Sequence, residues 1–352
     1  MKREIIHNVQ ALRFVAASAV AVSHIAALLV PYPAQSGFWS VPWTAGVDLF
    51  FVISGFIMVR LTDERFGAPG AAADFLKRRI IRIVPPYWFF TTLTIAAVLI
   101  LGGRVGGTTV DFPQTVTSFG FIPWPRADGQ LNPIVSQGWT LNYEAFFYLA
   151  FTLALLARRG LIVLCAAFLA FALVHPLIPA WLFVLKFWSN PIILDFLGGI
   201  VLAKIYLSGR RLPLWGSIAC AALAVIAFIA MSYSDFGFLS RFAERGIPAI
   251  LLAASLILAP EPKRLGAVRR LVQRGGDASY TIYLAHYMII NMFVLLWKRT
   301  GIGWPWAGVA AGMVVAIGAS MIFYQLVERP ITNALQRRYG RPRAAALDTV
   351  AP

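Results

Sequence analysis

The chain has 352 residues, of which 59% are hydrophobic and only 13% are charged. Soluble domains carry about twice that charged fraction, and no polar stretch in this sequence is long enough to form one. The composition therefore excludes the two soluble domains that the length alone would allow. It predicts a single membrane domain that crosses the bilayer many times.

Apolar stretches long enough for a membrane helix, about 17 residues or more, recur along most of the chain. We predict an all-α, polytopic bundle of about ten transmembrane helices, and the shorter stretches leave a count of nine or eleven open. The predicted spans are residues 11–30, 44–60, 86–103, 137–157, 161–180, 191–207, 212–230, 246–260, 279–297 and 305–327. They form one domain, residues 1–335, and residues 336–352 are expected to be a basic, disordered cytoplasmic tail.

The first span, ALRFVAASAVAVSHIAALLV, carries two ionisable side chains, Arg13 and His24. Ionisable groups at membrane depth are unfavourable, so their presence indicates function by default. A separation of eleven residues at about 100° each brings both side chains to one face of a helix, roughly 16 Å apart along its axis. A cation, Arg13, and a titratable base, His24, thus lie on the same face of the predicted helix. A cleaved signal peptide is not expected here, since the apolar run is long and further spans follow.

The net charge of +16 could indicate nucleic-acid binding, but the basic residues are distributed as in a membrane protein. With the N-terminus inside, 24 of the 31 Lys and Arg residues fall in cytoplasmic segments or at cytoplasmic span ends. The basic residues left outside are Arg104, Arg126, Lys186, Arg241, Arg245, Lys298 and Arg299. The positive-inside rule therefore predicts that both termini are cytoplasmic, and no nucleic-acid partner is expected.

Two connecting segments are long. Residues 104–136, predicted to lie outside, are rich in Gly, Pro and aromatic residues. Such a segment suits either a sugar face or the membrane interface without a ligand. Residues 61–85, predicted to form the main inside loop, end in Pro85, which together with Pro86 is expected to redirect the chain into the third span.

A cluster of arginines, Arg78, Arg79 and Arg82, lies at helical spacing near the end of this inside loop. Guanidinium groups match phosphate oxygens bidentately, so the cluster fits a pyrophosphate group. Juxtamembrane arginines more often serve topology or contact lipid headgroups. The cluster alone is therefore a weak indication of a phosphate site.

Further polar side chains lie inside predicted spans. At 1.5 Å per residue, counted from the outer ends of their predicted spans, His24 and Glu144 both lie about 10 Å below the outer membrane surface. Asp48 and Asp195 enter their spans from the outer side at shallower depth, and His286 lies nearer the inner surface. A base and several carboxylates at similar depth could surround one polar cavity. Alternatively, each could pair with a neighbour for packing alone.

The two cysteines, Cys165 and Cys220, both fall inside predicted spans. They provide neither a disulfide framework nor the spacing of metal ligands. We interpret them as packing residues and predict no metal site.

Six landmarks occur in the order seen in the acyltransferase-3 family of integral membrane O-acyltransferases. They are the Arg13/His24 pair, GVDLFFVISGFIM (46–58), RRIIRIVPPYW (78–88), GWTLNYEAFFYL (138–149), SYTIYLAHY (279–287) and ERPI (328–331). The chain resembles the family over about residues 8–332. It looks most similar to the exopolysaccharide acetyltransferase branch. GWTLNYE stands where many members have a Ser-Leu-Glu version of the motif, and this departure leaves the acceptor open.

The resemblance implies a reaction. An acyl group, most simply acetyl, would move from cytoplasmic acyl-CoA to a hydroxyl of an extracytoplasmic or lipid-linked polysaccharide sugar. Acyl-CoA would be a substrate rather than a permanently bound cofactor. Membrane lipids would be the other partners, and the protein would reside in the bacterial inner membrane.

The resemblance also implies roles for the polar residues. His24 would be the general base, because imidazole titrates near neutral pH, and Arg13 would hold the pantetheine or the thioester oxygen. Glu144 or Asp48 would orient His24 or the acceptor. The expected acyl-CoA-binding residues are Arg78, Arg79, Arg82, Tyr283 and His286. Two-step transfer through an acyl-histidine is the alternative to direct transfer.

Other classes of function compete with an acyltransferase. The same Arg, His and carboxylate side chains could form the relay of a proton-coupled small-molecule transporter, although no internal repeat pairs the two halves. A scaffold protein does not explain the polar groups. A serine hydrolase is disfavoured, because Ser54 lacks the strand–turn–helix context of a nucleophile elbow.

Overall fold

The computed structural model describes residues 6–30, 43–100, 110–231, 235–261 and 266–339. Within these ranges the regular structure is entirely helical, as predicted. The α-helices are α1 (His7–Leu29), α2 (Gly46–Thr62), α3 (Ala71–Ile100), α4 (Phe112–Phe119), α5 (Trp139–Ala154), α6 (Gly160–Leu173), α7 (Phe183–Trp188), α8 (Leu194–Leu207), α9 (Leu214–Met231), α10 (Ile247–Ile257), α11 (Ala267–Asp277), α12 (Ser279–Arg299), α13 (Pro305–Phe323) and α14 (Arg329–Tyr339).

Short 3-10 or π turns join or extend these helices. They are η1 (Trp43–Ala45), η2 (Asp63–Arg65), η3 (Ser136–Gly138), η4 (His175–Leu177), η5 (Pro191–Ile193), η6 (Gly237–Leu239), η7 (Phe242–Gly246) and η8 (Tyr324–Glu328).

Six helical segments of the described chain are long and apolar enough to cross a membrane. They are His7–Leu29, Trp43–Arg65, Ala71–Ile100, Leu214–Met231, Ser279–Arg299 and Pro305–Tyr339. The predicted count of about ten is therefore not confirmed. The other predicted spans coincide with α5, α6, α8 and α10, which have 16, 14, 14 and 11 residues. Three of these four continue a 3-10 or π turn at their N-terminus, so an irregular turn supplies part of the apolar run that the sequence presents.

The predicted inside loop, residues 61–85, is largely helical, and this part of the prediction is wrong. Helix α3 begins at Ala71 and continues through Pro85 and Pro86 to Ile100. Membrane helices tolerate proline where neighbouring helices support the backbone. The missing N–H groups of Pro85 and Pro86 free the carbonyls of Ile81 and Arg82. Next to them, the Tyr280 hydroxyl of α12 donates to the Ile83 carbonyl oxygen at 2.9 Å and ties α3 to α12. The cluster of arginines therefore lies on a continuous helix.

The outer segment and the tail also contain structure that composition did not indicate. The segment 104–136 includes α4, whose N-terminus is capped by the Asp111 carboxylate accepting from the Gln114 backbone N–H at 2.7 Å. At the other end of the chain, residues 336–339 belong to helix α14 rather than to a disordered tail. Residues 340–352 lie outside the described residues.

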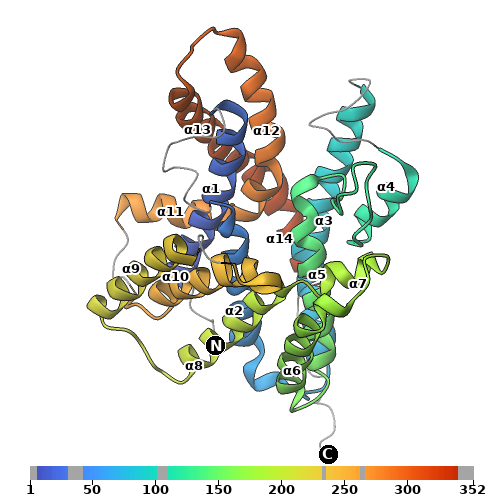
Figure 1. Ribbon diagram of the computed structural model, residues 1–352, viewed down its shortest axis with the longest axis vertical. Helices are drawn as coiled ribbons and strands as arrows, with labels where there is room; N and C mark the ends of the chain where they lie inside the picture. The colour runs from blue at the N-terminus through green and yellow to red at the C-terminus, as the bar shows by residue number, and fades with distance from the viewer. Residues whose placement is uncertain (1–5, 31–42, 101–109, 232–234, 262–265, 340–352) are drawn as a thin grey trace, which may run out of the picture.

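Helix α1 occupies the middle of the bundle (Figure 1). It runs beside α12 and α13, contacts α2, and is crossed by α11 (Figure 1). On the other side of the bundle α3 packs against α5, with α4 beyond it (Figure 1). Helix α1 therefore lies between the α11–α13 helices and the α3–α5 side of the bundle.

The most extensive helix pair is α2 with α8, which cross at glycines. A Cβ atom at Gly55 would meet the Phe196 carbonyl oxygen, and one at Gly199 would meet the Val52 carbonyl oxygen. Small residues at such a crossing let two membrane helices approach closely. Beside it the Phe196 ring stacks on Phe147 with centroids 4.0 Å apart. This rigid core holds α2 and α5 around the cavities described next.

Candidate active site

Arg13 and His24 lie on one unbroken helix, as the sequence predicts. Arg13 is buried, and its Nη1 donates to the Gln10 side-chain oxygen at 3.1 Å. Gln10 in turn donates to an Asp277 carboxylate oxygen at the end of α11 at 2.9 Å. Partial burial raises the pKa of Asp277 above its ordinary value, and the nearby Arg13 guanidinium opposes that rise. This chain of contacts fixes the Arg13 side chain against α11.

Arg13 opens into a cavity, called the Arg13 cavity below. Its charged lining residues are Arg13, Arg79, Arg82 and Glu144, which come from α1, α3 and α5. The remainder of the lining is mostly apolar or aromatic and comprises Val47, Phe50, Phe51, Ile53, Ser54, Ile57, Met58, Ile83, Thr140, Leu141, Tyr148, Ser279, Tyr280 and Tyr283. Three guanidinium groups at one cavity suit an anionic ligand with an apolar arm.

The three clustered arginines of α3 do not share one environment. Arg79 and Arg82 line the Arg13 cavity, whereas Arg78 does not. Arg78 is 44% exposed and lies 3.9 Å from the Asp74 carboxylate one turn earlier. Arg79 is held over the rings of Phe75 and Tyr148 at 5.7 and 6.0 Å, and its Nε has no hydrogen-bond partner in the described part of the chain. Two of the three residues are therefore placed to bind a ligand.

Glu144 lies with Arg13 and not with His24. The depth count from the sequence assumed that the fourth span begins at the outer surface. Instead, Gln137 and Trp139 at its start already line the cavity that contains His24. Glu144 is one to two turns further along α5, and it lines the Arg13 cavity. The expectation that Glu144 orients His24 finds no support in this geometry.

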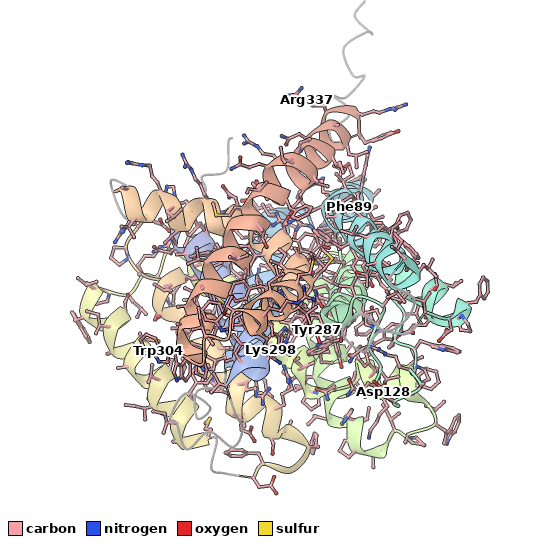
Figure 2. The ribbon with its side chains drawn as sticks, turned by 90° about the horizontal axis from the view of Figure 1, so that it is seen from above. Phe89, Asp128, Tyr287, Lys298, Trp304 and Arg337 are labelled. Carbon is pink, nitrogen blue, oxygen red and sulfur yellow. The ribbon has the colours of Figure 1, made fainter. Side chains whose placement is uncertain are left out.

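His24 lines a second cavity, called the His24 cavity below. Its lining residues are His24, Ala27, Leu28, Asn132, Ser136, Gln137, Trp139 and Tyr287. The Tyr287 ring meets the His24 imidazole edge-on, with centroids 5.4 Å apart. Tyr287 lies near the centre of the molecule when it is viewed along the long axis, whereas Asp128 and Arg337 lie toward the margin (Figure 2). Two aromatic rings, amides and a hydroxyl thus surround one imidazole.

Hydrogen-bonded polar groups lie between the two cavities. The Tyr283 hydroxyl donates to the Gln137 carbonyl oxygen at 2.7 Å and also lies 2.7 Å from the Thr140 hydroxyl. Tyr283 and Thr140 line the Arg13 cavity, while Gln137 lines the His24 cavity. A group passing between the cavities would cross at these residues. Tyr283 therefore lies where a residue that contacts a bound ligand is expected.

His286 contacts His24 rather than a site for acyl-CoA. It is completely buried on α12 and is not among the lining residues of the Arg13 cavity. Its Nε2 lies 2.9 Å from His24 Nδ1, and its Nδ1 lies 3.0 Å from the Ile282 carbonyl oxygen. The placement does not support the predicted contact with acyl-CoA.

Asp48 also lies away from His24. It is completely buried in the first turn of α2, and one carboxylate oxygen lies 3.2 Å from Nη2 of Arg241. Asp195 on α8 is equally buried, and its carboxylate has no hydrogen-bond partner among the described residues. The expected role in orienting His24 is therefore not supported, because Asp48 faces Arg241, just before η7, and does not line the His24 cavity.

Comparison with known proteins decides the family. The acyltransferase-3 family model, an acyltransferase domain, matches residues 6–325. The chain belongs to the acyltransferase-3 family. It is 33% identical to the exopolysaccharide production protein ExoZ of Rhizobium meliloti (strain 1021), over 85% of this chain and 91% of that protein. It is 28% identical to the acyltransferase MdmB of Streptomyces mycarofaciens, over 96% of this chain and 94% of that protein. No solved structure gives a significant match.

The protein is thus a multi-pass membrane acyltransferase, and the resemblance seen in the sequence is confirmed. Several polar residues in or near its site were not predicted from the sequence. Gln137 and Thr140 flank Trp139, and only their polarity at the start of a span could have singled them out. Glu328, within the ERPI motif, is buried and accepts a hydrogen bond from the Thr281 hydroxyl. Arg241 was counted only as an outside charge.

Proposed function

We infer that this acyltransferase moves an acetyl group from cytoplasmic acetyl-CoA to a sugar hydroxyl of a polysaccharide, or of its lipid-linked precursor, on the outer side of the inner membrane. One observation carries the proposal. Helix α1 places Arg13 in a cavity with two further arginines and His24 in a second cavity lined by aromatic and amide side chains. An anionic donor and a neutral hydroxyl acceptor need these two environments.

The Arg13 cavity suits the donor. Arg79 and Arg82 would bind the phosphate groups, since guanidinium donors form short, charge-assisted hydrogen bonds with phosphate oxygens. The apolar side chains beyond them, such as Phe50 and Ile53, would cover the pantetheine arm. Arg13, which lies roughly 16 Å from His24 along α1, would hold the pantetheine arm. Glu144, the one acidic side chain of this lining, would offset part of the positive charge of the arginines before the donor binds.

The His24 cavity suits a sugar. Aromatic rings such as Trp139 and Tyr287 cover the apolar faces of a pyranose, while the Asn132 and Gln137 amides can bond to its hydroxyls. The imidazole lies among these groups. The name of the relative ExoZ refers to exopolysaccharide production, which supports a polysaccharide acceptor.

In the proposed reaction, His24 removes the proton from the sugar hydroxyl while the oxygen attacks the thioester carbon. The new C–O bond forms as the C–S bond breaks, and coenzyme A leaves with the proton that the imidazole releases. The thioester would reach the acceptor past Tyr283 and Thr140. Membership of an acyltransferase family weighs against the proton-coupled transporter, which would not need acetyl-CoA.

The proposal is tested by analysing the secreted and surface polysaccharide for base-labile acetyl esters, with the gene present, deleted, or replaced by the His24→Asn variant. We expect esters only with the intact gene. Purified His24→Asn protein should still bind acetyl-CoA, because His24 is not a lining residue of the Arg13 cavity. Esters at the wild-type level in the His24→Asn strain would refute the assignment of the base.

A further inference from the structure

His286 has no role in the reaction as described so far, although it is fully buried beside the proposed base. The two imidazoles meet edge to edge at His24 Nδ1 and His286 Nε2, with centroids 5.0 Å apart and planes at 25°. Tyr287 packs edge-on against the His24 ring. His24 is thus held between two rings of the same helix, α12. Such packing restricts rotation of the imidazole, and the hydrogen bonds at its nitrogens decide which one carries the proton.

The hydrogen bonds form a chain with a single consistent direction. The Ile282 carbonyl oxygen can only accept, so Nδ1 of His286, 3.0 Å away, must carry a proton. A neutral imidazole has one N–H group, so Nε2 of His286 presents a lone pair. It lies 2.9 Å from Nδ1 of His24, which must therefore be the donor. The proton of neutral His24 then resides on Nδ1, and its Nε2 carries the lone pair.

The alternative, a charged His286, would reverse this bond. It would place a cation at a completely buried position. Within the described ranges, the groups that contact its ring are His24, Tyr283 and the Ile282 carbonyl oxygen, and none of them is anionic. A buried charge without an opposite charge is strongly unfavourable, so His286 is neutral.

We propose that His286 is a positioning residue that holds His24 in the Nδ1–H tautomer, so that Nε2 of His24 is the atom that accepts the proton of the acceptor hydroxyl. The proposal rests on the proposed function for the identity of the base. His286 itself takes no proton. After His24 accepts the proton at Nε2, its Nδ1–H continues to donate to His286, and the ring keeps its orientation until the proton leaves with coenzyme A.

In this proposal His286 orients His24, which is the role that the sequence led us to expect of Glu144 or Asp48. Both carboxylates lie elsewhere, in the Arg13 cavity and beside Arg241. A neutral acceptor orients the imidazole without adding a charge next to the His24 cavity. The structure thus provides a base with a fixed tautomer in the absence of a carboxylate partner among the described residues.

Two substitutions separate the hydrogen bond from the packing. His286→Leu fills a similar volume but cannot accept, whereas His286→Gln can present its side-chain oxygen to Nδ1 of His24. General-base catalysis contributes about 10²- to 10⁴-fold, so His286→Leu should lower kcat by about 10²-fold or more while the KM for acetyl-CoA stays unchanged. His286→Gln should recover most of the rate. A raised KM with an unchanged kcat would show that His286 binds the donor and would overturn the proposal.

Nitrogen-15 NMR of histidine-labelled wild-type protein tests the tautomer without any assay of activity. The chain has four histidines, so the signals of His24 can be assigned with single-histidine variants. We expect a protonated-type shift for Nδ1 and an unprotonated-type shift for Nε2. The reverse pattern in the wild type would refute the proposal. Activity retained in His24→Asn would instead refute the proposed base, and the two failures are therefore distinguishable.

Discussion

Replacing Arg82 by alanine should weaken the binding of acetyl-CoA far more than replacing Arg78. Arg82 lines the Arg13 cavity, whereas Arg78 is 44% exposed and lies near Asp74. Losing a charge-assisted hydrogen bond removes about 1.5–3 kcal/mol. At about 1.4 kcal/mol per decade, the Kd for acetyl-CoA should rise about 10- to 150-fold in Arg82→Ala. In Arg78→Ala it should rise less than about threefold, because exposed charges are screened by solvent and salt.

The assay is titration of acetyl-CoA into purified protein in detergent, and an unchanged unfolding temperature shows that each variant is folded. Arg78→Ala is the matched control, because it removes the same charge from α3 one turn earlier. Raising the salt concentration should weaken binding to the wild type and have a smaller effect on Arg82→Ala. Equal Kd values for the two variants would refute the assignment of the Arg13 cavity to the donor. They would indicate that these arginines set the membrane topology or contact lipid headgroups.

Two further predictions concern stability. Gly55→Ala should destabilise the protein by about 1–3 kcal/mol, because the added Cβ would meet the Phe196 carbonyl oxygen. The control is Gly318→Ala, because a Cβ atom at Gly318 would have nothing within 4 Å. In thermal unfolding this control should be neutral or mildly stabilising. An equal loss of stability in the two variants would contradict the close α2–α8 crossing. Arg241→Met should destabilise by about 2–3 kcal/mol, below the ~3–5 kcal/mol of a fully buried pair because Arg241 is 27% exposed. Adding Asp48→Asn should recover part of that loss, and no recovery would show that the pair is not coupled.

The sequence predicted the helical class and the features that lie within one element. The Arg13–His24 spacing depends only on helical geometry, and both residues lie on α1 as expected. The prediction ended the inside loop at Pro85, because proline usually ends or bends a helix. That rule considers only the local sequence, whereas α3 continues through Pro85 and is contacted there by the neighbouring helix α12. The number of spans was not confirmed either, since apolar composition does not distinguish a long helix from a short one preceded by an irregular turn.

The relations between elements were harder to predict. The depth of Glu144 was counted from an assumed outer surface, and Trp139 at the start of its helix already lines the His24 cavity. The two cavities are separate because a side chain from α12, Tyr283, bonds to residues 137 and 140 near the start of α5. No property of either segment alone specifies that contact. The pairing of His24 with His286 has the same origin in tertiary packing.

The central claim is that donor and acceptor reach one helix from opposite sides of the membrane. It is tested most directly with sealed vesicles that contain the protein in one orientation and acceptor polysaccharide on its outer side. Radiolabelled acetyl-CoA, which does not cross the bilayer, is supplied to one face at a time. We predict base-labile label in the polysaccharide only when acetyl-CoA is on the cytoplasmic face, and none with His24→Asn. Transfer only when acetyl-CoA and polysaccharide share one face would contradict the account.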